Sequence, residues 1–243
     1  MATMTTRKQG NAVATQAAKA LAFKRRLLQP TGNKIKLEKG RFQMPDGQSL
    51  EQLRAIILDY RFVNAYYDKP YDPDIQDVAP ACLAMSAFPG ELQAYPNSPV
   101  LQHEGSCKDC PQNQFGSSTN GKGKACSNRM RLAIVTFDAE EGLSDVHTLE
   151  VPPTGLKQFN GYLRNLLGVD ILPHETVSLI EQDPTKTYSV PAFAKTNHEP
   201  FNKAALTAIE AKIQEAQELL DAEPDFSTYT PPQAIKRRAG AKR

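Results

Sequence analysis

The chain has 243 residues, of which 40% are hydrophobic and 23% are charged, so it is long enough to bury a substantial core. Its formal charge of +2 conceals two basic ends around an acidic middle. Residues 1–45 hold ten Lys and Arg and one acid, and residues 231–243 hold five Lys and Arg and no acid. No apolar run is long enough to cross a bilayer, which argues against a membrane protein, whereas basic ends are typical of proteins that bind nucleic acid or another polyanion.

The amino end predicts a basic arm over residues 1–33. Residues 1–15 are small and polar, and residues 15–29 (TQAAKALAFKRRLLQ) favour a helix with a basic face that ends at Pro30. Lys19 interrupts the Ala-rich stretch, so this segment lacks the apolar centre of a secretory signal. We therefore expect a cytoplasmic protein.

Several segments favour strands. Residues 34–44 alternate apolar and basic side chains. Residues 53–67 (LRAIILDYRFVNAYY) are rich in β-branched and aromatic side chains and predict a long strand, although Ser49 and Gln52 resemble the start of a helix. Further strands are expected at residues 83–88, 130–137, 147–152, 175–182 and 186–194.

Two helices are predicted in the second half of the chain. The first begins at Thr154, a good N-cap residue, and ends at Gly168. One face of this helix carries apolar residues at helical spacing, namely Leu156, Phe159, Leu163, Leu166 and Leu167. The second is an amphipathic pattern over residues 202–220, after which prolines lead into the basic tail. A helix placed between the later strands fits a mainly β, α+β fold, namely a five-stranded barrel of the OB type.

All four cysteines lie in one stretch, as Cys82, Cys107, Cys110 and Cys126. The CxxC pair lets two thiolates of one tight turn bind a single ion, and four thiolates make a closed tetrahedral zinc site. His103 is the alternative to Cys82 as the fourth ligand. Disulfides or a redox pair would also use cysteines, but we see neither a secretory signal nor a βαβ pattern around the pair. We therefore predict one structural zinc ion.

The predicted zinc loop also carries positive charge and an aromatic ring. Four basic residues surround Cys126: Lys122, Lys124, Arg129 and Arg131. Phe115 lies in the same loop. Charge and an exposed ring on a metal-fixed loop suit a nucleic-acid surface. The alternative is a solvated loop in which Phe115 covers the zinc.

These patterns divide the chain into three parts. The basic arm of residues 1–33 precedes an OB-like core over residues 34–200. The zinc-binding insertion occupies residues 82–131 of that core. Residues 201–243 supply the amphipathic helix and the basic tail.

Several motifs resemble the zinc-containing single-stranded DNA-binding proteins of phages and prophages. The likeness covers roughly residues 50–195 and includes Asn64, Tyr67 and Pro80; its most specific parts are CxxCPxNxxGS, GKGKAC and VPPTxLK. These proteins are similar to the helix-destabilising replication proteins of tailed bacteriophages, which are OB folds with an embedded zinc ribbon. The resemblance favours Cys82 as the fourth ligand. One departure is the basic carboxyl end, where many single-stranded DNA-binding proteins carry an acidic tail.

The resemblance implies sequence-independent binding of single-stranded DNA during phage replication or recombination, in the cytoplasm of a bacterial host. Other replication or recombination proteins and further copies of the chain are the implied protein partners. Bases would stack on aromatic rings and phosphates would meet cations. Besides the zinc-loop residues, the candidate contacts are Tyr60, Arg61, Phe62, Tyr66 and Lys69. Strand alternation places the three rings on one face, although they could instead fill the barrel.

Two other classes of function compete with DNA binding. A zinc deaminase requires an H-x-E motif and P-C-x-x-C, and neither pattern occurs. The HExxH motif of zinc proteases is also absent, so we do not expect an enzyme. A zinc-stapled adaptor for transcription or replication is the remaining alternative, in which the helix at residues 202–220 pairs with a partner helix.

Overall fold

The computed structural model describes residues 33–38, 40–69, 78–138, 142–183, 185, 186 and 188–232. The expected basic arm up to residue 32 and the basic tail beyond residue 232 lie outside these ranges. The strands are β1 (Lys34–Glu38), β2 (Arg41–Gln43), β3 (Ser49–Leu50), β4 (Gln52–Tyr66), β5 (Cys82–Ser86), β6 (Cys126–Asp138), β7 (Gly142–Leu143), β8 (His147–Val151), β9 (Ser178–Gln182) and β10 (Pro191–Lys195). The helices are α2 (Leu156–Leu167) and α3 (Lys203–Leu220), with short 3-10 turns η2 (Pro89–Glu91), η3 (Pro111–Asn113), η4 (Pro153–Gly155) and η5 (Pro173–Glu175).

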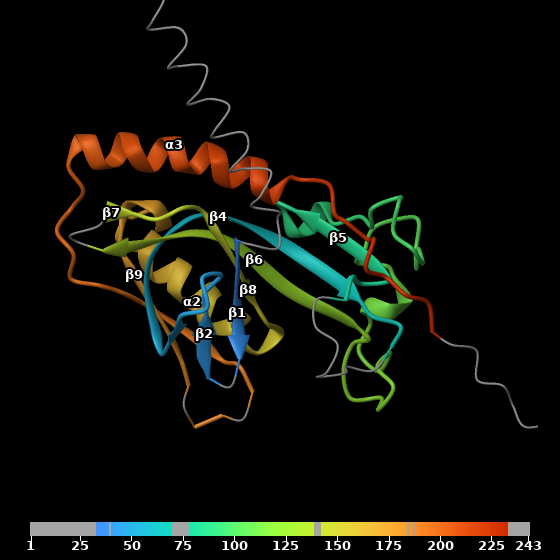
Figure 1. Cartoon of the computed structure of the whole chain (residues 1–243). Coiled ribbons are helices and arrows are strands. Elements are labelled where there is room, and N and C mark those ends of the chain that lie inside the picture. The colour runs from blue at the N-terminus through green and yellow to red at the C-terminus, as the bar shows by residue number, and fades with distance from the viewer. Residues whose placement is uncertain are drawn as a thin grey trace, which may run out of the picture.

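The strands form one sheet that curls into a half-barrel (Figure 1). Eight strands follow the order β10-β9-β4-β6-β8-β1-β2-β3, and β5 and β7 pair with β4 and β6. The predicted mainly β fold is confirmed, as is the long strand in place of a helix after Ser49. The sheet has ten strands, whereas the sequence favoured seven strand segments and a five-stranded barrel. Residues 34–44 divide into β1 and β2, and the two-residue strands β3 and β7 are too short to show a hydrophobic period.

β4 is a fifteen-residue strand that contains a bulge. Its pairing with β6 shifts between Ile57 and Asp59. Ile57 belongs to the inner core, and Tyr60 and Phe62 pack against the same core. Strict alternation from Ile57 would instead have pointed Asp59 and Arg61 inward. The bulge therefore turns the two rings toward the core and Arg61 toward the outer face.

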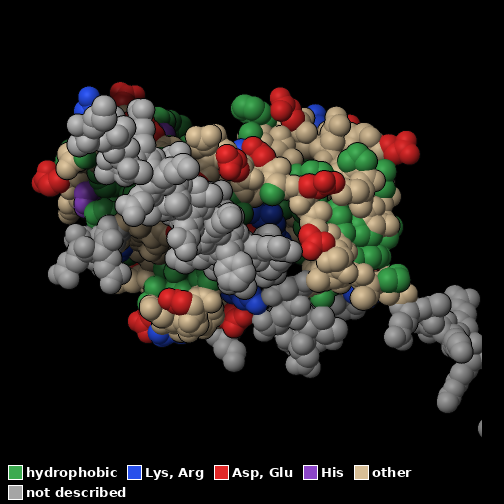
Figure 2. All heavy atoms as spheres, turned by 45° about the horizontal axis from the view of Figure 1, so that its top comes forward, with side chains coloured by type: hydrophobic (Ala, Val, Ile, Leu, Met, Phe, Trp, Pro, Cys, Tyr) green, Lys and Arg blue, Asp and Glu red, His purple; other side chains and the backbone are tan. Residues whose placement is uncertain are grey.

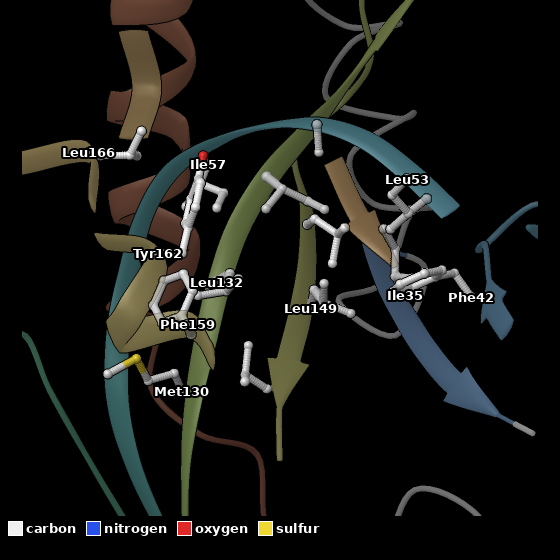
Figure 3. Close-up of a cluster of buried hydrophobic side chains, with 14 residues drawn as sticks. Ile35, Phe42, Leu53, Ile57, Met130, Leu132, Leu149, Phe159, Tyr162 and Leu166 are labelled. Atoms are coloured by element: carbon white, nitrogen blue, oxygen red, sulfur yellow. The ribbon is translucent and has the colours of Figure 1, made fainter. Parts of the chain in front are cut away.

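The inner core lies between the curled sheet and α2 (Figure 3). Phe159, Tyr162 and Leu166 are spaced three and four residues apart on α2, and all three are buried. The hydroxyl groups of Tyr162 and Ser178 are 2.5 Å apart, so the buried phenol has a hydrogen-bond partner. The helical spacing read from the sequence thus identified Phe159 and Leu166 on the packed face of α2, but Leu167, which belongs to the same pattern, is 60% exposed.

The start of α2 differs from the prediction. Thr154, the expected N-cap, lies in η4, and its hydroxyl donates to the carbonyl of Ser189 at 2.5 Å. Gly155 takes the N-cap position without any side-chain cap. A Cβ at Gly155 would lie 2.7 Å from a ring atom of Pro191, so the close approach of β10 requires glycine there.

α3 covers the outer face of the sheet (Figure 1). The side chain of Asn202 caps it by accepting from the backbone N–H of Ala205 at 2.9 Å. Ile209, Ala216 and Leu220 are buried against outward-facing side chains of β4 and β6. The apolar face that an adaptor would offer to a partner helix therefore packs on its own sheet. None of the helices in the described ranges has the length and apolarity needed to cross a bilayer.

A C-terminal strap, residues 221–232, runs from the end of α3 past β5 toward the cysteine-bearing end of the sheet (Figure 1). Phe226 of the strap packs against the small cluster around Val63 of β4. The hydroxyl of Tyr229 donates to the Asp68 carboxylate at 2.7 Å. The strap thus joins α3 to the far end of β4.

Candidate metal centre and nucleic-acid interface

The four cysteines meet where β4 ends. Tyr66, the last residue of β4, pairs with Cys82 of β5 on one side and with Cys126 of β6 on the other. Cys107 and Cys110 come from the long connection between β5 and β6. All four thiols are unpaired and buried, and they line one cavity of about 10 Å³. A cavity of this size holds a single water-sized species.

Burial opposes ionisation of the thiols in this cluster. Burial, reinforced by the neighbouring thiols, raises the pKa of Cys126 to about 12. Burial also raises the pKa of Cys107, although a hydrogen bond with Asn64 opposes the shift. Within the described ranges, no three Cys, His, Asp or Glu side chains already stand at the spacing of a formed metal site. The donor chemistry, four buried thiols around one small cavity, fits a thiolate-binding ion such as zinc.

His103 borders the same cavity as the cysteines. Gly105 leaves room for the imidazole, because a Cβ at that position would lie 3.0 Å from Nε2 of His103. Both His103 and Cys82 therefore border the space that an ion would occupy. The metal content of single variants separates these two candidates for the fourth ligand.

The loop after the CxxC pair holds Phe115 in solvent. This ring is 84% exposed, so it does not cover the cysteine cavity. Gly116 and Gly121 have φ angles of 91° and 67°, a backbone conformation that a side chain would strain. Lys124 lies over the Phe115 ring with its Nζ 5.7 Å from the ring centroid, and Lys122 is exposed at the loop tip.

Arg129 and Arg131 project from β6 as a fixed, partly buried pair. Glu150 of β8 accepts from the two guanidinium groups at 3.2 and 2.8 Å. Burial opposes ionisation of Glu150, but the charges of Arg131, Lys34 and Arg129 outweigh it and lower the pKa of this carboxyl to about 2. Arg129 also lies over the ring of Tyr67, 5.5 Å from its centroid. One carboxylate thus faces three cations.

The expected aromatic platform is divided between two environments. Tyr60 and Phe62 are partly buried, with ring centroids 6.1 Å apart, and Tyr60 meets Phe159 of α2 at 5.6 Å. Tyr66 instead lines the cysteine cavity. Tyr60 and Phe62 therefore contribute to packing against the inner core, as the barrel-filling alternative held, and both stay partly exposed.

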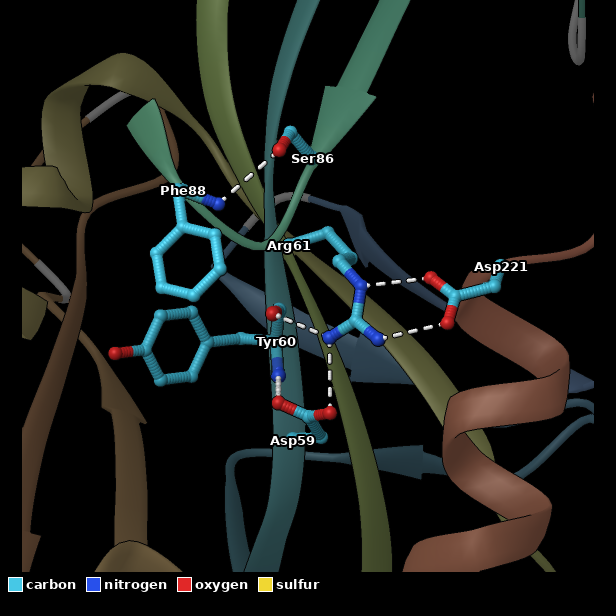
Figure 4. A network of polar contacts seen from close by, with 6 residues as sticks. All are labelled: Asp59, Tyr60, Arg61, Ser86, Phe88 and Asp221. Atoms are coloured by element: carbon cyan, nitrogen blue, oxygen red, sulfur yellow. Dashed lines mark hydrogen bonds and ion pairs between the residues drawn. The ribbon is translucent and has the colours of Figure 1, made fainter. Parts of the chain in front are cut away.

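Sequence reasoning missed Phe88. This ring is 62% exposed just beyond β5, and Figure 4 shows it beside Tyr60 on the same side of β4. The backbone N–H of Phe88 donates to the hydroxyl of Ser86 at 3.1 Å, which holds the turn. The Pro89–Gly90 pair was the available signal, because a turn straight after an apolar strand leaves its last residue at the surface.

Two expected phosphate contacts are engaged within the protein. Arg61 is 7% exposed, and its guanidinium binds both carboxylate oxygens of Asp221 at 2.8 and 3.0 Å and one of Asp59 at 2.8 Å (Figure 4). Lys69 donates to the Thr230 hydroxyl in the strap at 2.6 Å. Arg61 therefore ties β4 to the end of α3, and its buried, neutralised charge lacks the exposure that a phosphate contact requires.

Replacing Arg61 with alanine is expected to lower the free energy of unfolding by roughly 1.5–3 kcal/mol, because two carboxylates lose a charge-assisted partner. Urea unfolding of the purified protein measures the loss. Arg54→Ala is the matched control, since Arg54 is an exposed arginine on the same strand and should change stability by less than about 0.5 kcal/mol. Equal losses in the two variants would show that the tie to α3 contributes nothing.

Known proteins give no further information on these candidate residues. Comparisons with models of protein families, with curated proteins and with solved structures found no match to this chain. The resemblance to phage single-stranded DNA-binding proteins therefore stands on the motifs themselves.

Proposed function

We propose that this chain is a single-stranded DNA-binding protein that acts without sequence preference in phage DNA replication or recombination. The observation that carries the proposal is the loop after the CxxC pair, where the 84%-exposed ring of Phe115 lies beside the ammonium group of Lys124. An exposed ring stacks on any base, and a cation beside it can meet a phosphate. The same loop carries two of the three motifs of the resemblance.

The proposed surface extends from this loop onto β6. Lys122, Arg129 and Arg131 add positive charge, and Phe88 beside Tyr60 offers a second place for a base to stack. A half-barrel with α2 across its inner core is compatible with an OB-type fold. The α3 face is less suited to a polyanion, since Figure 2 shows acidic side chains scattered over its described part.

We infer that the proposed site includes structural zinc. Cys82, Cys107, Cys110 and Cys126 would hold the ion, with His103 as the alternative to Cys82. Bound zinc supplies folding energy to a segment that has little apolar core of its own. The chain's own residues then fix Phe115 and Lys124 relative to the sheet, and no catalytic step is proposed.

Titration of labelled oligonucleotides by fluorescence anisotropy tests the function. Single strands should bind more tightly than duplex at moderate salt. Phe115→Ala should cost roughly 1–3 kcal/mol of binding free energy, because a stacked base loses its platform. Lys124→Ala should reduce the slope of log affinity against log salt by about 0.7 for each lost phosphate contact.

Lys203→Ala is the matched control for Lys124→Ala. Lys203 is an exposed lysine at the start of α3, at the opposite end of the molecule from the cysteines (Figure 1). Its loss should leave both affinity and salt slope unchanged. Equal affinity for duplex and single strands, or binding that survives Phe115→Ala and Lys124→Ala unchanged, would contradict the proposal.

An apolar cleft favours the adaptor as a second candidate function. It has a volume of about 260 Å³ and lies between the bulge of β4, α2 and η5, lined by Tyr60, Leu163, Leu167, Leu172, Pro173 and His174, among others. Leu167 and Leu172 are 60% and 44% exposed, which suits a protein contact. An adaptor would bind no oligonucleotide in the titration above and would lose its partner on Leu167→Asp.

A further inference from the structure

Three asparagines form a continuous chain of amide hydrogen bonds beside the cysteine cluster. Asn64 of β4 and Asn128 of β6 are directly opposed in the sheet, and Nδ2 of Asn128 donates to Oδ1 of Asn64. The same Nδ2 donates to Oδ1 of Asn113, in η3, at 3.0 Å. The orientations of the three amides are therefore coupled, because turning one amide would leave its neighbours without a hydrogen-bond partner.

One end of this chain lies at the cysteine cavity, which Asn64 and Cys107 both border. The chain is anchored on the CxxC turn, because Nδ2 of Asn113 donates to the backbone carbonyl of Cys107 at 2.8 Å. An ion held by Cys107 would fix the turn whose carbonyl Asn113 binds.

The other end of the chain reaches the exposed loop. Nζ of Lys124 donates to Oδ1 of Asn113 at 3.1 Å while it lies over the Phe115 ring. Lys124 is therefore held both by the hydrogen bond from its ammonium group and by its contact with the Phe115 ring. Asn64 is 5% exposed, so the chain runs from the buried cluster outward to solvent.

We propose that Asn64, Asn113 and Asn128 are positioning residues that hold Phe115 and Lys124 in the arrangement that binds a single strand, and that they relay the state of the cysteine cluster to that surface. This inference rests on the proposed function. Loss of the metal frees the turn that carries Cys107, Asn113 moves with this turn, and Lys124 leaves the ring. Affinity for a polyanionic strand then falls while the sheet stays folded.

Asn128→Leu breaks the chain at its centre with a side chain of similar size. The zinc-loaded, full-length variant should keep its metal, measured by elemental analysis, and its cooperative melting. It should bind a thymidine oligonucleotide about tenfold more weakly, the loss expected for one well-placed hydrogen bond. Trypsin should cut at Lys122 faster than in the unchanged protein, which reports loop mobility without reference to DNA.

A double-mutant cycle separates positioning from general damage. Once Lys124 is replaced by alanine, Asn128→Leu should cost little further affinity, because the group that it positions is gone. Asn97→Ala is the matched control, since its amide makes a similar 2.9 Å bond, to Glu223, outside the chain. Should Asn128→Leu fail to fold, Asn113→Ala cuts the same chain at a half-buried position and is judged by the same outcomes.

Unchanged oligonucleotide affinity and unchanged cleavage at Lys122 would overturn the inference, and so would a full additive loss in the double mutant. Failure of the unchanged protein to bind any single strand refutes the proposed function instead. In that case faster cleavage in Asn128→Leu, and in unchanged protein stripped of metal by a chelator, still supports the relay, and equal cleavage rejects it.

Discussion

Protein in which Cys126 is replaced by serine is expected to bind no zinc and to melt about 6–12 °C below the unchanged protein. A structural ion contributes folding energy directly, and a loss of about 3 kcal/mol shifts the melting temperature of a chain of this size by that amount. Cys126 begins β6 opposite the last residue of β4, so the loss falls on the end of the sheet that carries the loop. Elemental analysis and calorimetry on the same sample measure both effects.

The unchanged protein and two further variants complete this test. A fully folded, metal-free protein as purified would refute the zinc assignment. Cys82→Ser and His103→Ala then identify the fourth ligand, because both residues line the cavity. We expect Cys82→Ser to lose the ion and His103→Ala to keep it; the opposite pattern would make the histidine the ligand.

Replacing Phe159 with alanine is expected to cost roughly 3–5 kcal/mol of unfolding free energy, because the variant loses a large buried ring and leaves a cavity. Phe159 is fully buried, and its ring meets those of Tyr60 and Phe193 at 5.6 and 5.0 Å. It is therefore the point at which α2, β4 and β10 join. Urea unfolding monitored by circular dichroism measures the loss.

Leu167→Ala is the control for this prediction. Leu167 is on the same helix but 60% exposed, so its truncation should change stability by less than about 0.5 kcal/mol. A Phe159→Ala variant as stable as Leu167→Ala would mean that the inner core does not depend on the helix. The Leu167 variant also leaves the oligonucleotide surface intact, so its affinity for single strands should be unchanged.

The features that could be predicted from the sequence are those with a short-range pattern. The helical spacing around Phe159 predicted part of the buried face of α2, and the β-branched, aromatic composition after Leu53 predicted β4. The CxxC spacing indicated that Cys107 and Cys110 would act together, and the structure brings them to one cavity with the other two cysteines. In each case neighbouring residues alone carry the information.

The features that could not be predicted depend on residues far apart in the chain. Arg61 looked like an exposed cation among aromatic residues, but its partner Asp221 lies 160 residues away at the end of α3. The N-cap at Thr154 was lost because β10 packs against Gly155, which no local rule reveals. Strand alternation also does not reveal a bulge, so it cannot tell which residues of β4 beyond Ile57 point toward the core.

The bulge of β4 also bears on how this chain can change in length. It gives the strand one residue more than regular pairing with β6 needs, at Ile57–Asp59. Deleting Leu58 would straighten the strand and leave Tyr60 and Phe62 on the core side, with Arg61 still facing out. Inserting one residue beyond the bulge would exchange those faces and bury a guanidinium among aromatic rings. Beyond the bulge, β4 therefore keeps its two faces only if residues are added in pairs or a further bulge takes up the extra residue.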